Sequence, residues 1–174
     1  MAAPVRLALG PTAFPPGPLS GAWWPRSDDL KAELPALAAV FDPHPGRITR
    51  IATTRDAWST TSHDLPVQGH TVRARWVIPG CDPYTIRLFS YAVARWDLLV
   101  IPHGTAADTA GRLMSAASDP ANRLTAGALV AAEQERLPVG GPQERPTVPA
   151  GYGRAWRSTR PHIDAYCRHS GPVT

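Results

Sequence analysis

The sequence predicts one α+β domain, with an antiparallel sheet of four or five strands and two or three helices packed on one face. Three observations lead to this prediction. The chain has 174 residues, a length that suits a single domain. Its middle part contains several stretches in which apolar and polar residues alternate, as they do in half-buried strands. Segments with helical periodicity precede and follow these stretches.

The N-terminal part is expected to contain one strand and one helix. Residues 5–9 (VRLAL) are the strand candidate, and GAWWPRSDDLKAEL at 21–34 leads into the helix. Ser27 is the expected N-cap, because its hydroxyl can accept a hydrogen bond from an unpaired backbone N–H. One helical face carries apolar residues, at Leu30, Leu34, Leu37 and Phe41. Pro35 interrupts this helix, so we expect a kink or two short helices.

Four stretches predict the main strands of the sheet. They are residues 46–52, 70–78, 84–90 and 94–102. The last of them is apolar on both faces in its second half, as in a central strand. The connections between the last three stretches are short enough for hairpins, so we expect neighbouring antiparallel strands there.

Two helices are expected to close the domain, over residues 105–118 and 119–135. Asp119 is a suitable N-cap for the second helix, and Pro120 occupies its first turn, where a missing N–H costs little. The apolar periodicity ends after Pro138. We therefore place the domain at residues 1–136.

The C-terminal segment, residues 137–174, is rich in proline and arginine and is predicted to be largely disordered. It contains five arginines and two acidic residues, a net charge of +3 out of the chain's +4, which leaves about +1 for the rest. Seventeen of the 18 basic residues are arginine, as expected from a GC-rich genome. The basic charge is therefore weak evidence for a nucleic-acid partner.

The apolar run near the N-terminus is not expected to form a signal peptide or a membrane span. The run LALGPTAF at 7–14 is short and is broken by glycine and proline. A cytoplasmic protein without a membrane partner is the resulting expectation.

Trp23 and Trp24 are the first candidate binding residues. Neighbours on an extended chain point in opposite directions, so one ring should enter the core and the other should lie at the sheet edge or line a pocket. We expect Trp24 to be the buried ring, because Pro25 holds it extended just before the helix. Trp23 would then line the pocket, with Arg26 beside it to bind an anion or stack on a ring.

Three arginines form the second candidate site. Alternation along 70–78 and 84–90 places Arg73, Arg75 and Arg87 on the same face of two neighbouring strands, and Arg50 is a further candidate. Like charges opposite one another destabilise a sheet. Asp97 and solvent can relieve this repulsion, or the arginines form a site for an acidic ligand, a phosphate or an acidic partner.

Catalytic and metal-binding patterns are weak in this chain. The histidines and acidic residues show no recognisable catalytic spacing, and the HExxH, GxSxG and P-loop motifs are lacking. The run from His162 to His169 lacks a fourth ligand at the spacing of structural zinc sites. The sequence therefore predicts no catalytic residue, no cofactor and no metal.

Five segments resemble a set of small actinobacterial proteins known only as a domain of unknown function. In order, they are GAWWPRSDDLKAELPAL, GRITRI followed by Trp58, YTIRL, WDLLVIP and AASDPANRL, within about Arg6 to Ala132. The resemblance implies an uncharacterised intracellular protein and transfers no catalytic residue. This chain departs from the usual pattern in its long basic C-terminal segment and in Tyr84.

Three functional hypotheses follow from these features. The favoured one is a non-enzymatic binding or regulatory module for a small acidic ligand or a protein partner. The second is a weak nucleic-acid binder that uses the arginines and the basic C-terminal segment. The third is an enzyme whose site uses His70, Asp97 or His103.

Overall fold

The computed structural model describes residues 4–11, 17–42, 47–60, 62–77, 81–91 and 94–136. The C-terminal segment, predicted to be disordered, lies outside these residues. The described elements are β1 (Leu7–Leu9), β2 (Gly21–Trp23), α1 (Leu30–Phe41), β3 (Ile48–Thr54), a 3-10 turn (Arg55–Ala57), β4 (Asp64–Val67), β5 (His70–Val77), β6 (Thr85–Ser90), β7 (Arg95–Val100), α2 (Ala107–Ser118) and α3 (Ala126–Arg136).

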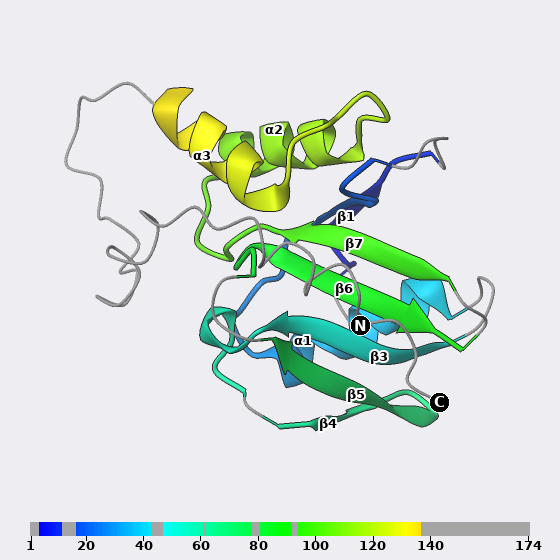
Figure 1. Ribbon diagram of the computed structural model, residues 1–174. Coiled ribbons are helices and arrows are strands. Elements are labelled where there is room, and N and C mark those ends of the chain that lie inside the picture. Colours follow the sequence, from blue (N-terminus) through cyan, green and yellow to red (C-terminus); the bar gives the residue numbers. More distant parts are fainter. Residues whose placement is uncertain are drawn as a thin grey trace. The chain divides into compact units, whose positions relative to one another are not determined.

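The described strands form one mixed sheet in the order β1-β2-β7-β6-β3-β5-β4 (Figure 1). Two neighbouring pairs are parallel, β2 with β7 and β3 with β5, and the other pairs are antiparallel. The α+β class is confirmed, but the expectation of a purely antiparallel sheet of four or five strands was wrong. The two unexpected strands, β2 and β4, have three and four residues, too few to show a clear alternation.

Strand β3 lies between β5 and β6, which were expected to be neighbours. β5 instead forms a hairpin with β4, through a two-residue turn at Gln68 and Gly69. Gly69 has a φ of +82°, a conformation that suits glycine in such turns. The expected hairpin between β6 and β7 is confirmed, because these strands pair in an antiparallel register.

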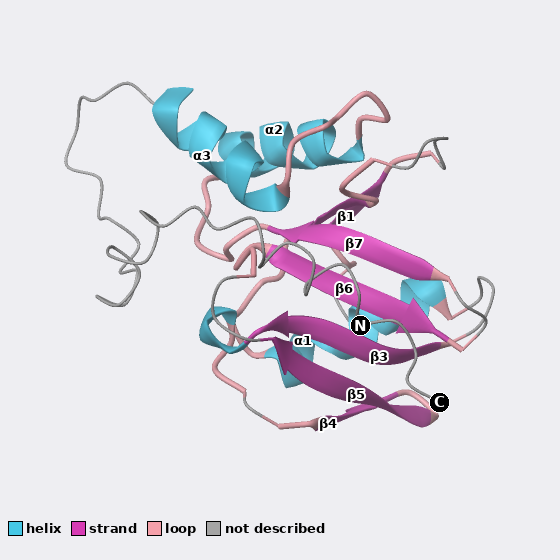
Figure 2. Cartoon of the chain, viewed as in Figure 1, coloured by secondary structure: helices cyan, strands magenta, loops and turns pink. Residues whose placement is uncertain are grey.

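Helices cover both faces of the sheet, whereas all were expected on one face (Figure 2). α1 packs on one face, where its Leu34 and Phe41 share a core with Leu98 of β7. α2 and α3 pack on the opposite face, where their apolar residues meet Leu99 and Ile101. The reason is that the second half of β7, together with Ile101 after it, is apolar on both sides, and each side needs a cover.

The first helix, α1, has a different N-cap residue from the expected one, and it continues through Pro35 as one helix. Asp29, not Ser27, is the N-cap, because its carboxylate accepts the backbone N–H of Lys31 at 3.0 Å. The Thr60 hydroxyl also donates to Asp29, at 2.7 Å, and this bond lowers the pKa of the carboxyl group. The proline does not break the helix, because the buried residues on either side of it hold both turns against the sheet.

The last helix begins at Ala126, seven residues later than expected, after a turn at 120–121 and an irregular stretch at 122–125. Its first turn is capped from a distant part of the chain. Asp82 accepts the backbone N–H of Gly127 at 2.6 Å, and the Thr125 hydroxyl accepts that of Ala128 at 3.3 Å. A carboxylate at this end also complements the helix dipole.

Candidate functional site

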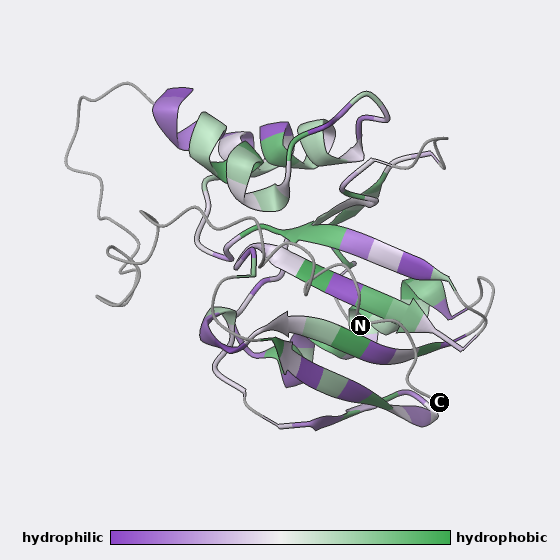
Figure 3. Cartoon of the chain, viewed as in Figure 1, coloured by the Kyte–Doolittle hydropathy of each residue, from purple (hydrophilic) through white to green (hydrophobic). Residues whose placement is uncertain are grey.

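Five arginines project from the sheet face opposite α1, on β3, β5, β6 and β7. We call this surface the arginine face and define it by Arg50, Arg73, Arg75, Arg87 and Arg95. α2 and α3 contact mainly β1, β2 and β7, so the arginines of β3 and β5 remain exposed. Figure 3 shows hydrophilic residues recurring along these strands among apolar ones. The prediction that Arg73, Arg75 and Arg87 share a face agrees with the strand registers.

One row of side chains crosses four strands of the arginine face. Asp64 of β4 lies opposite Arg73 of β5, which lies opposite Arg50 of β3. Arg50 in turn lies opposite Phe89 of β6, and its guanidinium lies 5.6 Å from the centre of that ring. Neighbouring strands are about 4.8 Å apart, so Arg50 and Arg73 place two like charges side by side.

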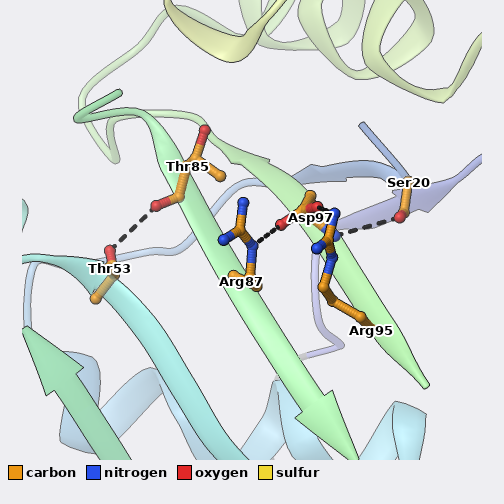
Figure 4. Close-up of polar contacts among 6 residues, drawn as sticks. All are labelled: Ser20, Thr53, Thr85, Arg87, Arg95 and Asp97. Atoms are coloured by element: carbon orange, nitrogen blue, oxygen red, sulfur yellow. Dashed lines mark hydrogen bonds and ion pairs between the residues drawn. The ribbon is translucent and has the colours of Figure 1, made fainter. Parts of the chain in front are cut away.

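Beside this row lies an ion-pair cluster centred on Asp97 (Figure 4). Asp97 is only 9% exposed, and its two oxygens accept from Arg87 Nε at 2.5 Å and from Arg95 Nη2 at 2.9 Å. The Ser20 hydroxyl oxygen accepts the backbone N–H of Asp97 at 3.2 Å. This carboxylate therefore joins β6 to β7 and neutralises one of the two guanidinium charges beside it.

Arg50, Arg73 and Arg75 differ from the two arginines beside Asp97. All three are exposed, and within the described residues no salt bridge joins any of them to a carboxylate. Like charges on neighbouring strands are destabilising when nothing neutralises them. These three side chains are the part of the arginine face that can accept a ligand.

Glutamine in place of Arg87 is expected to destabilise the fold more than glutamine in place of Arg73. Arg87→Gln removes a charged hydrogen bond to a buried carboxylate and should cost about 1–3 kcal/mol. Arg73→Gln changes an exposed side chain and should cost within about 0.5 kcal/mol. Urea denaturation of both variants measures the difference, and equal losses would show that Asp97 does not depend on Arg87.

The two tryptophans point to opposite faces of the sheet, as expected, but their roles are reversed. Trp23 is the buried ring, 1% exposed, and stacks on Trp58 with ring centres 5.4 Å apart. Trp24 is half-buried on the opposite side, with the Arg6 guanidinium 3.6 Å from its ring centre. The expectation that Trp24 is buried was wrong, because Trp23 pairs with Val100 and so faces the core beneath α1.

A small pocket of about 170 Å³ lies beside the tryptophans. Its lining residues are Pro4, Val5, Arg6, Trp23, Trp24, Arg26, Ala32, Glu33 and Ala36. Arg6 donates to the carbonyl oxygens of Trp24 and Pro25, and Arg26 donates to that of Pro4 at 3.1 Å. Burial, aided by the charge of Arg26, lowers the pKa of Arg6. These guanidinium groups tie two backbone segments together, and the pocket that they line is separate from the arginine face.

The residues considered for acid–base catalysis do not come together. His70 lies on the α1 side of the sheet and contacts the carbonyl oxygen of Ile48 at 2.8 Å. Asp97 lies on the opposite face, and His103 follows the end of β7. Among the described residues, no group of three or more His, Cys, Asp or Glu side chains is arranged to hold a metal ion. None of the described helices is both long and apolar enough to cross a membrane.

Sequence reasoning missed Arg95 of the arginine face and two side chains opposite its arginines, Phe89 and Asp64. Arg95 lies two residues before Asp97 on β7, so the alternation along the strand was a usable signal. Phe89 lies two residues after Arg87 on β6, so the same alternation places it on this face. Asp64 carried no signal, because the short strand β4 was not predicted.

Comparisons with known proteins give one family match. A model of a family described as "Family of unknown function (DUF5994)" matches residues 6–117. A search of curated proteins and a search of solved structures both found no match.

Proposed function

The chain belongs to DUF5994, a family of unknown function, and we propose that it is a non-enzymatic binding module whose arginine face receives an anionic ligand or partner. The observation that carries this proposal is the set of three exposed guanidinium groups at Arg50, Arg73 and Arg75. They lie on two adjacent strands, and no carboxylate among the described residues pairs with them.

The guanidinium group is well suited to such a role. It is planar, stays charged at any physiological pH, and can donate two parallel hydrogen bonds to a carboxylate or phosphate. Asp97 shows this chemistry on the same surface, because one carboxylate accepts from arginines on two neighbouring strands. An added anion near Arg50 and Arg73 would relieve their repulsion in the same way.

A triple variant tests the proposal. R50Q/R73Q/R75Q should weaken binding of anionic probes by at least about tenfold, since the loss of three charged contacts exceeds 1.4 kcal/mol. Suitable probes are inorganic pyrophosphate, an oligoglutamate peptide and single-stranded oligothymidylate, measured by titration at low salt. Binding should also weaken as salt is added, because exposed charges are screened.

R47Q/R123Q/R136Q is the matched control, because it removes the same charge from exposed arginines outside the arginine face. It should bind the probes within about twofold of the wild type. Thermal melts of both variants verify that they remain folded. Equal weakening in the two variants, or no binding of any probe by the wild type, would refute the proposed function.

A further inference from the structure

We infer that the partner of the arginine face is an extended acidic segment of a protein, with carboxylates at every second residue. This inference rests on the proposed function and specifies the class of the partner. Its basis is the spacing of Arg73 and Arg75, with the side chains that surround them.

The spacing of these arginines matches that of an extended chain. Arg73 and Arg75 both lie on β5 and are separated by one residue, so their Cα atoms are about 6.6 Å apart. In an extended peptide, the side chains on one side recur at this same distance. Acidic side chains at every second residue would therefore meet successive arginines. Arg50 lies opposite Arg73 on the next strand and offers a third contact at one end of such a segment.

The arginine face is an exposed sheet surface, and this favours an extended partner over a small ligand. Small-molecule sites are usually concave and enclose most of the ligand. The pocket beside the tryptophans is lined by residues from 4–6, 23–26 and α1 and by none of the arginines of β3 or β5. A segment that lies along β5 would instead use several weak contacts in parallel.

The same surface is poorly suited to a nucleic acid. Single strands bind through bases that stack on exposed aromatic rings, but the ring of Phe89 lies beneath the guanidinium of Arg50. Asp64 also lies on this face, opposite Arg73, and its charge opposes a continuous phosphate backbone.

Two peptides of equal composition test the inference. One alternates glutamate and serine over about twelve residues, and the other places the same residues in two blocks. Fluorescence anisotropy at low salt should show the alternating peptide binding at least about fivefold more tightly. R73Q/R75Q should abolish this preference, whereas R123Q/R136Q, with the same loss of charge, should retain it.

The possible results separate the inference from the proposed function. If both peptides bind equally tightly and R50Q/R73Q/R75Q still weakens their binding, the inference is overturned. The proposal that the arginine face binds anions is then retained. If oligothymidylate binds more tightly than either peptide and R50Q/R73Q/R75Q no longer binds it, the partner is a nucleic acid. The inference fails in that case too. If the wild type binds no probe, the proposed function itself is wrong.

Discussion

Replacing Trp23 with alanine is expected to lower the free energy of unfolding by about 3–5 kcal/mol, and the same change at Trp24 by less than half of that. Trp23, the last residue of β2, is buried in the core beneath α1 and stacks on Trp58, so its loss leaves a large cavity. Trp24 is half-buried, and its ring contacts the flexible side chain of Arg6. Urea denaturation of both variants measures the two losses.

Trp23→Phe is the control for this comparison. It retains an aromatic ring against Trp58 and most of the buried area, so its loss should fall well below that of Trp23→Ala. Equal and large losses for the two alanine variants would place both rings in the core. Equal and small losses of unfolding free energy would mean that residues 21–25 do not hold the sheet and α1 together.

Substitution of Gly21 by alanine is expected to destabilise the protein by at least about 3 kcal/mol, because strain and a steric clash add. Gly21 has a φ of +153°, which residues with side chains rarely adopt. A Cβ atom built there would lie 2.1 Å from the carbonyl oxygen of Ala8 and 2.9 Å from the Cα of Leu9. Both atoms belong to the backbone of the paired strand β1, so β1 would have to move away from β2.

Gly111→Ala provides a control with the opposite sign. Gly111 lies on the exposed side of α2, and nothing lies within 4 Å of a Cβ built there. Alanine should raise the free energy of unfolding by about 1 kcal/mol, because it is the better helix former. Thermal and urea melts compare the two variants. A stable Gly21→Ala protein would show that β1 does not pair closely with β2.

The residues that share a face of the sheet could be predicted from the sequence alone. In β5, β6 and β7, side chains alternate with a period of two, so a local pattern determines which residues point the same way. That pattern placed Arg73, Arg75 and Arg87 on one face. It also indicated that the second half of β7 is apolar on both sides, the feature that requires a helix layer on each face.

The order of the strands was decided only by the tertiary structure. The alternation of β3 and β5 carries no information about which strand each will pair with, and these two strands pair in parallel with β4 between them in the chain. As a result, β3 separates β5 from β6 and brings Arg50 opposite Arg73. The candidate site therefore gained a member whose position the local pattern did not determine.

The different states of the arginines and tryptophans also depend on tertiary contacts. Arg73 and Arg87 follow the same alternation, but only Arg87 lies opposite Asp97, so one is exposed and the other is held in an ion pair. The sequence by itself determined that Trp23 and Trp24 point in opposite directions. The helix layer beneath each ring decided which one is buried, because burial depends on what packs against a side chain as well as on its direction.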